Sequence, residues 1–319
     1  MSTTEESTTT PLPTTSAVTK RRNVRKRALI VGINQYENPA NNLQGCVNDA
    51  LDMAETLKIC GFPRTKIKVV TDANATKAGI LKGLDWLTSG AADGDVLVFY
   101  YSGHGSQVSD LDDDEQDKED EIICPHDISW ARQTYIKDDD LHNYFTKKLP
   151  EGVRTDVILD SCFSGTATRT MVTEANPGTR MAYHKQRYLP PPLDHEFRIT
   201  SSIPQFTKKE SIGDRLVTKT QHNSLWAGCQ EYQVSWELLF EDSVRGAFTY
   251  YFTRILRRSN GNMSRREIYE TLRPSMYEDG FEQVPALEVP DNKPEALELF
   301  PFRKEREVDR PSEVVAVKK

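Results

Sequence analysis

The sequence predicts an α/β fold with a mostly parallel central sheet. Short apolar runs alternate along the chain with segments whose apolar residues recur at helical spacing, a pattern typical of alternating strands and amphipathic helices. The apolar runs are continuous, as in strands that helices cover on both faces. Two of them, residues 96–101 and 157–159, end in turns that contain glycine.

The first half of the chain supplies most of the predicted sheet. The first strand is expected to end at Gly32 and Asn34, where residues typical of turns begin. Gly61 and Pro63 end the first helix, because glycine favours the position after a helix and proline cannot continue one. We predict strands at residues 28–33, 67–70, 96–101 and 157–159, and helices at residues 50–57, 80–87 and 140–148.

The pattern dissolves between residues 166 and 222, where proline, glycine and basic residues prevail. This composition predicts a long insertion or loop. Periodicity then resumes. We predict a strand at residues 224–227, helices at residues 248–256 and 265–272, and a last strand at residues 296–300 before a charged tail.

The composition excludes several classes of protein. The chain has 319 residues, 37% hydrophobic and 28% charged, with a formal net charge of -7, unlike collagen-like or fully disordered chains. No apolar run approaches the roughly 18 residues of a membrane-spanning helix. The mildly acidic balance argues against non-specific nucleic-acid binding. We therefore expect a protein that binds neither membranes nor nucleic acid.

The N-terminus and the cysteines predict a cytoplasmic protein. The first 19 residues hold 11 Ser or Thr and no apolar stretch, so they lack the hydrophobic region of a secretory signal. Five cysteines are too few, and odd in number, for a disulfide framework, so we expect free thiols. Cys60, Cys124 and Cys229 lack the spacing of zinc ligands.

We divide the chain into one domain with two flanking segments. Residues 1–25 form a Ser/Thr-rich arm, residues 26–302 the α/β domain, and residues 303–319 a charged tail. Within the domain, residues 26–165 form a first part, 166–222 the insertion and 223–302 a second part that completes the sheet. A basic cluster lies where the arm meets the domain, just before the first apolar run, and it consists of Lys20, Arg21, Arg22, Arg25, Lys26 and Arg27.

The two glycine-containing turns carry the residues best suited to chemistry. His104 follows the strand 96–101 and precedes Gly105, and Cys162 follows the strand 157–159. Ligands of open α/β sheets bind beyond the carboxyl ends of the strands. A thiol needs an imidazole within reach to become a nucleophile. We therefore predict a catalytic pair of Cys162 and His104.

These turns resemble the signature turns of metacaspases, including the bacterial caspase-like forms. The resemblance rests on Tyr-Tyr-Ser-Gly-His-Gly around His104 and Asp-Ser-Cys-Phe-Ser-Gly around Cys162. Other matching segments lie at residues 28–34, 43–50, 120–127, 226–230 and 246–249. The resemblance covers residues 26–302, weakly between 166 and 222, and it implies a caspase-like fold. The aspartate-specific animal caspases carry a different Cys motif.

The resemblance implies a cysteine endopeptidase. Cys162 would attack the scissile carbonyl, His104 would transfer protons, and water would release the acyl-enzyme. The backbone N–H groups of Gly105 and Cys162 would form the oxyanion hole.

Specificity for Arg or Lys is predicted from charge and from the resemblance. Asp49 and Asp160 match the family's acidic pocket residues, and two carboxylates attract a basic side chain before the cut bond and repel Asp. Cys46 and Ser102 match the smaller polar lining of that pocket. Without the resemblance, Asp49 reads equally well as a solvated helix residue or cap.

Calcium is a second implication of the resemblance. Asp120, Asp138 and Asp139 match three carboxylates of the family's activating site, but Arg169 stands at the fourth position, and a guanidinium cannot ligate a cation. Residues 110–121 include nine acidic residues in 12 positions, yet they lack the Gly of an EF-hand loop and read as a solvated loop. Calcium is thus expected only as an activator, and no cofactor is required for the chemistry.

Self-processing is predicted from the insertion. A peptidase that cuts after basic residues could cut itself there or in the basic cluster, because nicking concentrates in exposed loops. A merely long insertion and a solvated arm are the alternatives. The basic residues of the insertion considered for this role are Arg169, Arg180, Lys185, Arg187, Lys208 and Lys209.

Two readings without proteolysis compete with the peptidase. One is a caspase-like scaffold whose acidic loop and insertion bind a partner, since fold does not imply function. The other is a calcium-binding protein. The presence of His104, Cys162 and both acidic pocket residues favours the peptidase. Its expected partners are protein or peptide substrates with Arg or Lys before the cut bond, and the resemblance implies a monomer.

Overall fold

The computed structural model describes residues 24–109, 119–163, 184–192, 212, 216–217, 222–230, 233–290, 292–299 and 301–303. The strands of its main sheet are β1 (Lys26–Gly32), β2 (Ile67–Thr71), β3 (Val96–Ser102), β7 (Arg154–Asp160), β9 (His222–Ala227) and β12 (Ala286–Glu288). They lie in the order β12-β9-β7-β3-β1-β2, and only β12, at one edge, is antiparallel to its neighbour.

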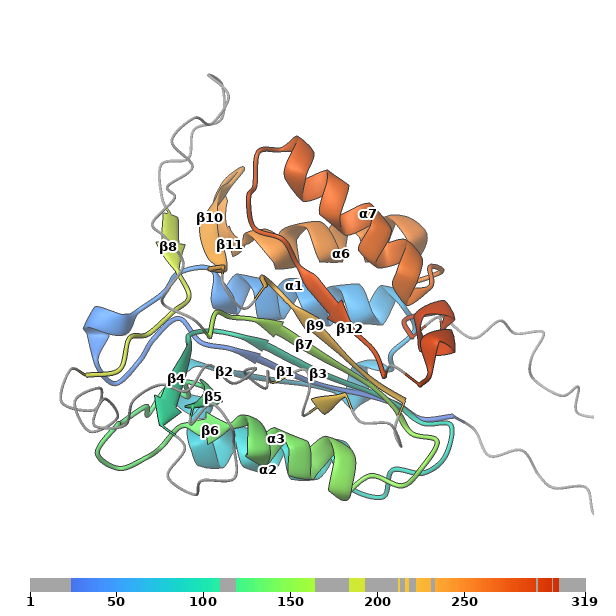
Figure 1. Cartoon of the computed structure of the whole chain (residues 1–319), viewed down its shortest axis with the longest axis horizontal. Helices are drawn as coiled ribbons and strands as arrows, with labels where there is room; N and C mark the ends of the chain where they lie inside the picture. Colours follow the sequence, from blue (N-terminus) through green and yellow to red (C-terminus); the bar gives the residue numbers. More distant parts are fainter. Residues whose placement is uncertain are drawn as a thin grey trace, which may run out of the picture.

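Helices cover both faces of this sheet (Figure 1). One face carries α1 (Cys46–Ile59), with α6 (Ala247–Ser259) and α7 (Arg265–Glu278) packed beyond it, and the other carries α2 (Lys77–Thr88) and α3 (Asp138–His142). The sheet therefore separates two hydrophobic clusters. This arrangement confirms the predicted α/β class and explains why its strands are continuous apolar runs.

The two central strands end level with each other. Every residue of β3 is buried, and in its parallel pairing with β7 the last residues, Ser102 and Asp160, lie side by side. The chain leaves both strands at the same edge of the sheet. His104 and Cys162, each two residues further on, are therefore brought to one place by the strand register.

Two small sheets flank this edge. One joins β4 (Gly105–Ser109), β5 (Glu119–Ile123) and β6 (Ile136–Lys137), and the other joins β8 (His184–Gln186), β10 (Trp236–Phe240) and β11 (Ser243–Gly246). The prediction of an irregular loop over residues 166–222 is therefore wrong for β8, which pairs antiparallel with β10. A polar strand of three residues exists because it pairs with a neighbouring strand, and its own sequence contains no apolar pattern that would predict it.

The predicted last strand at residues 296–300 is also wrong. The described part of that segment is a 3-10 helix, Pro294–Glu298, and the edge strand is β12 instead. Proline suits the first turn of a helix because its φ is fixed and it has no N–H to give to a ladder. The carbonyl of Ala296, which is fully buried, accepts a hydrogen bond from Arg265 of α7.

The helix predicted at residues 140–148 begins earlier, at Asp138, and changes after α3 into a π-helical turn, Asn143–Lys147. The terminal arm 1–25 and tail 303–319 lie almost wholly outside the described residues. Within the described part of the chain, no helix combines the length and apolar character needed to cross a membrane. All five cysteines are free, as predicted, and the structure shows that all five are buried.

Candidate active site

His104 is held in one orientation by its neighbours. Its backbone N–H donates to the hydroxyl of Tyr36 at 2.9 Å, and the two rings pack at 5.1 Å between centroids. Its Nε2 lies 2.8 Å from the carbonyl oxygen of Asn41. Because a carbonyl can only accept, Nε2 carries the proton and Nδ1 is the basic nitrogen. Nδ1 is buried and finds no hydrogen-bond partner among the described residues.

Burial also sets the charge of this imidazole. His104 is 2% exposed, and burial lowers its pKa to about 4, although the hydrogen bond to the Asn41 carbonyl opposes that shift. At neutral pH the ring is therefore uncharged. A neutral imidazole with a free Nδ1 can accept a proton.

Cys162 lies on the turn after β7 and is fully buried. Its Sγ donates to the carbonyl oxygen of Gln233 at 3.0 Å. The thiol of Cys229 lies within 3.3 Å of the same oxygen, so both sulfur atoms lie beside Gln233. Burial and the neighbouring Cys162 thiol, which is the larger cause, raise the pKa of Cys229 well above its ordinary value.

The four predicted pocket residues come together next to Cys162. Ser102 donates its hydroxyl to Asp49 at 3.1 Å, and the N–H of Gly246 donates to both oxygens of Asp49 at 3.0 Å. Asp160 accepts hydroxyl hydrogen bonds from Ser235 and Thr249, each at 2.6 Å. The carboxylates are thus fixed in place by partners from β3, β11, α6 and the segment before β10.

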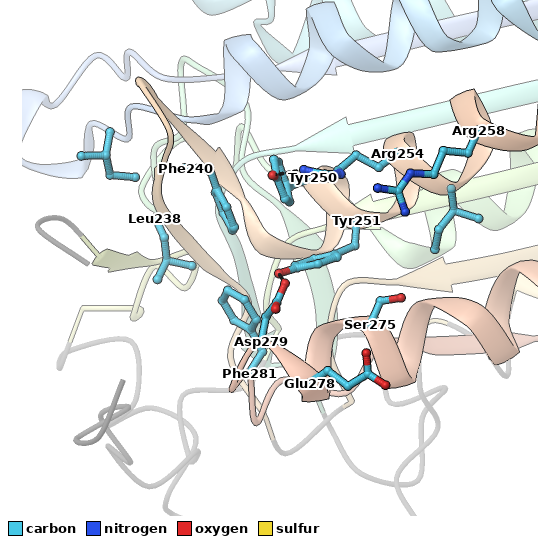
Figure 2. A pocket seen from close by; sticks show the side chains of 12 residues that line it. Leu238, Phe240, Tyr250, Tyr251, Arg254, Arg258, Ser275, Glu278, Asp279 and Phe281 are labelled. Carbon is cyan, nitrogen blue, oxygen red and sulfur yellow. Dashed lines mark hydrogen bonds between the residues drawn. The ribbon is translucent and has the colours of Figure 1, made fainter. Parts of the chain in front are cut away.

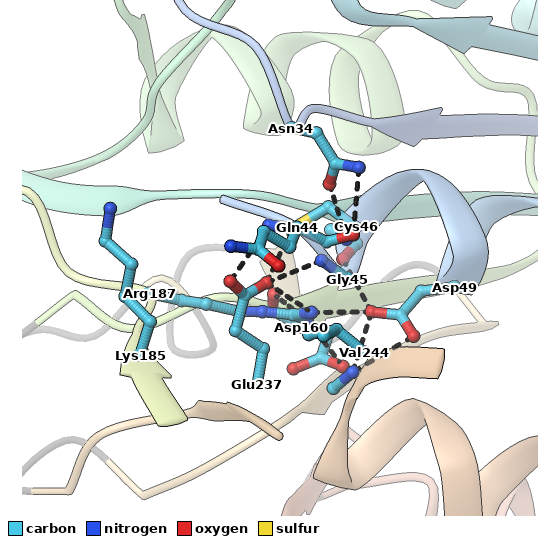
Figure 3. Close-up of polar contacts among 12 residues, drawn as sticks. Asn34, Gln44, Gly45, Cys46, Asp49, Asp160, Lys185, Arg187, Glu237 and Val244 are labelled. Atoms are coloured by element: carbon cyan, nitrogen blue, oxygen red, sulfur yellow. Dashed lines mark hydrogen bonds and ion pairs between the residues drawn. The ribbon is translucent and has the colours of Figure 1, made fainter. Parts of the chain in front are cut away.

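The side chain of Arg187 fills the pocket. Its guanidinium lies 2.6 Å from Asp49 and 2.9 Å from Asp160, and all three side chains are fully buried. The remaining polar wall is Glu237, at 3.7 Å from the same guanidinium (Figure 3). Cys46 Sγ, the fourth predicted lining group, lies 3.9 Å from Glu237.

The backbone of Arg187 is bound as well. Its carbonyl oxygen accepts from the N–H of Gly105 at 3.0 Å and from the N–H of Cys162 at 3.3 Å. These are the two donors predicted for an oxyanion hole. An arginine thus presents its side chain to the acidic pocket and its carbonyl to both N–H groups beside the thiol.

The electrostatics of the pocket follow from burial and from the excess of carboxylates. Burial raises the pKa of Asp49 to about 6, with Arg187 opposing the shift and Asp160 adding to it. Burial acts to lower the pKa of Arg187, but Asp160 and the other acidic neighbours raise it well above the ordinary value. The pocket is therefore built for a permanent cation.

Glu237 is the site residue that the sequence analysis missed. It is the second residue of β10, and its carboxylate accepts from the N–H groups of Gln44 and Gly45 at 2.9 and 2.8 Å. The sequence does contain one signal for this residue, because it is an acidic residue inside the otherwise apolar run 236–240. Burying a carboxylate is costly unless it is paired, so such a residue indicates a site.

The strand β10 also borders a second pocket. Leu238, Leu239 and Phe240 line this pocket of about 450 Å³ between β10, α6 and α7, with Tyr250 and Tyr251 opposite (Figure 2). Among the described residues that line it there is no Cys or His. The chemistry-bearing side chains belong to the face of β10 that holds Glu237.

The three predicted calcium ligands do not assemble into a comparable group. Asp120 is on β5, where the ammonium of Lys137 pairs with its carboxylate, and Asp138 and Asp139 start α3, with the Asp138 carboxylate accepting the Asp139 N–H. The described residues contain no cluster of three or more His, Cys, Asp or Glu that could hold a metal. In this arrangement the described residues supply no three-ligand calcium site, and Arg169 lies outside the described residues.

Comparisons with known proteins point to one family. The profile described as "Metacaspase, peptidase C14 domain" matches residues 26–171. The chain is 32% identical over 289 residues to metacaspase-1 of Pyricularia oryzae, which covers 82% of this chain and 71% of that protein. It is 31% identical to metacaspase-1A of Aspergillus oryzae over 73% of this chain, but it spans only 61% of that relative's length.

A solved structure agrees with the fold. The crystal structure of a protein from Geobacter sulfurreducens, 26% identical, superposes with a TM-score of 0.63 and covers 88% of this chain and all of that one. The match includes both halves of the α/β domain, beyond the 26–171 segment of the family profile.

Proposed function

The chain belongs to the metacaspase family, and from this premise we propose that it is a cysteine endopeptidase that cleaves peptide bonds after Arg or Lys. Its fold is caspase-like. One observation supports the specificity most directly. A basic side chain, that of Arg187, lies between the carboxylates of Asp49 and Asp160 while its own carbonyl accepts from Gly105 and Cys162.

The proposed chemistry uses a dyad without a third catalytic side chain. The sulfur of Cys162 attacks the carbonyl carbon of the basic residue, and Nδ1 of His104 takes the thiol proton and passes it to the leaving amine. Water then attacks the acyl-enzyme, with Nδ1 again accepting the proton. The N–H groups of Gly105 and Cys162 stabilise the oxyanion, each by about 3 kcal/mol in comparable sites.

Three carboxylates around one cation also account for the choice of substrate. Asp49, Asp160 and Glu237 surround a buried position that water cannot screen well. Arg or Lys gains charge-assisted hydrogen bonds there. An Asp side chain would add a fourth negative charge and is excluded.

Hydrolysis of three fluorogenic peptides that differ only in Arg, Lys or Asp before the reporter tests this function. We expect turnover of the Arg and Lys peptides, none of the Asp peptide, and none of any peptide with the Cys162→Ala or His104→Ala variant. Cleavage after Asp, or an active Cys162→Ala variant, would contradict the proposal. Absence of turnover under every condition would favour the scaffold instead.

Calcium stimulation is proposed only as an addition to this function, and no step of the chemistry runs through the ion. For Asp120 to ligate calcium, the Lys137 ammonium must leave its carboxylate. Stimulation should therefore be stronger in Lys137→Gln than in the parent protein. Equal hydrolysis with excess chelator and with millimolar calcium, in both proteins, would remove calcium from the proposal.

A further inference from the structure

We propose that the Arg187–Tyr188 peptide bond is the site at which this enzyme cuts its own chain. The inference rests on the proposed function and deepens it, because it selects one bond among the several basic residues of the insertion. Residues 184–189, which we call the inserted strand, lie in the active site as a substrate would. The contacts on both sides of the bond carry the argument.

On the N-terminal side of the bond, the inserted strand extends a sheet. β8 pairs antiparallel with β10, with Gln186 opposite Trp236 and Lys185 opposite Glu237. The ladder continues into Arg187, whose N–H donates to the carbonyl of Ser235 at 3.0 Å. Extended peptides bind proteins in this way, by adding a strand to an exposed edge.

At the bond itself, the pocket accepts one residue of the inserted strand and leaves its neighbours out. The side chain of Arg187 is fully buried among the carboxylates. Lys185, two residues earlier, is partly exposed and gives its ammonium to the carbonyl of Asn42. Lys185 and Arg187 lie two residues apart and therefore on the same side of the strand, so depth separates them: only Arg187 reaches the buried carboxylates.

On the C-terminal side, the inserted strand is held by β4. Leu189 donates its N–H to the carbonyl of Gly105 at 3.0 Å and accepts from the hydroxyl of Ser106 at 2.5 Å. Leu189 is 9% exposed and belongs to one of the two hydrophobic clusters that the main sheet separates. Tyr188 forms a bridge with Gly105. The bond 187–188 is thus fixed from both ends.

The expected reaction is hydrolysis of that bond. The Cys162 sulfur bonds to the carbonyl carbon of Arg187, the C–N bond to Tyr188 breaks, and the thiol proton passes through His104 to the new amine of Tyr188. Water then cleaves the thioester, leaving the Arg187 carboxylate and the free thiol. Until this occurs, the inserted strand occupies the pocket and covers Cys162, which is 0% exposed.

The primary test is the N-terminal sequence and intact mass of the fragments that the purified parent protein forms during incubation. We expect a new N-terminus at Tyr188, absent from the Cys162→Ala variant. Arg187→Lys should still be cut, because it keeps the charge, and Arg187→Gln should not. Arg180→Gln, another basic residue of the insertion and outside the described residues, is the matched control and should be cut normally.

A second variant keeps the pocket contacts and blocks the cut. Tyr188→Pro replaces the leaving amine of the cut bond with the ring nitrogen of proline, and it changes neither Arg187 nor the carboxylates that contact its side chain. We expect this protein to remain whole and to hydrolyse the Arg peptide at least tenfold more slowly than the processed parent, because the inserted strand stays in the site.

The outcomes separate this inference from the proposed function. Turnover of the Arg peptide by a parent protein that is never cut after Arg187 would overturn the inference and leave the function standing. The same holds if Arg187→Gln is processed at the parent rate. A protein that neither hydrolyses the peptide nor cuts itself would overturn both.

Discussion

The molecule has two groups of three acidic residues, and they differ in how the fold uses them. Asp49, Asp160 and Glu237 come from three distant segments and converge on one guanidinium within 3.7 Å. The second group consists of Asp120, which belongs to the very acidic stretch 110–121, and of Asp138 and Asp139, which follow it. These three form no three-ligand cluster among the described residues. The charged site is made by carboxylates that converge from distant segments, rather than by a high density of acidic residues in the sequence.

The largest expected effect comes from removing the most constrained carboxylate. Asp160→Asn should lower kcat/KM for the Arg peptide at least a hundredfold, because a buried, hydrogen-bonded ion pair costs about 3 kcal/mol or more when one partner is lost. Steady-state hydrolysis measures this. Asp139→Asn, from the other acidic group, is the matched control, and its kcat/KM for the Arg peptide should stay within about twofold of the parent value in the absence of calcium. An equal loss of kcat/KM in both variants would contradict the difference between the two groups.

A glycine in the pocket wall gives the next test. A Cβ at Gly246 would lie 2.3 Å from an Asp160 oxygen and 2.4 Å from a nitrogen of the Arg187 guanidinium. Gly246→Ala should therefore raise KM about tenfold for the Arg peptide, as expected of a close contact of this kind. The narrower ammonium of Lys should suffer less, so the ratio of Arg to Lys hydrolysis should fall. An unchanged ratio would mean that the guanidinium does not reach this wall.

The pH dependence of substrate binding tests whether the charge of Asp49 contributes to binding. Its pKa is raised to about 6, so the carboxylate is charged above this pH and neutral below it. KM for the Arg peptide should rise as the pH falls through about 6. In Asp49→Asn, KM should be high at every pH and should lack this transition. A transition that persists in the variant would assign it to another group.

The smallest effect is expected for the most distant carboxylate. Glu237 lies 3.7 Å from the guanidinium, beyond hydrogen-bond distance. Glu237→Gln keeps one of the two oxygens that accept from Gln44 and Gly45, and it should raise KM only severalfold, or by about 1 kcal/mol. Titration of the variant with the Arg peptide measures this, and a loss as large as that of Asp160→Asn would show that the three carboxylates act as equals.

The sequence predicted the parts of the fold and site that continuous apolar strands determine. β3 and β7 were visible because both faces are buried, and their ends locate His104, Cys162 and Asp160. Asp49 and Cys46 required the resemblance, because a carboxylate in the first turn of a helix reads equally well as a solvated residue. These residues converge because of the register in which the strands pair, and this register cannot be predicted from any local sequence pattern.

The elements that the sequence did not predict are those whose structure depends on contacts with another segment of the chain. β8 is the tripeptide His-Lys-Gln, which has no strand signal, and it is a strand because β10 offers an edge. Glu237 was missed because β10 itself was not predicted. Residues 296–300 looked like a strand by composition, but Pro294 starts a 3-10 helix there. In each case, tertiary contacts override local preference.

The hydrogen bond from the Cys162 thiol to the Gln233 carbonyl has a consequence for reactivity. A sulfur that donates to a carbonyl keeps its proton, and the imidazole of His104 is uncharged at neutral pH. The uncut enzyme thus holds a thiol and an imidazole rather than a thiolate and an imidazolium. Because thiolates are the form that haloacetamides alkylate, the uncut chain should resist these reagents, and release of the inserted strand should make Cys162 susceptible.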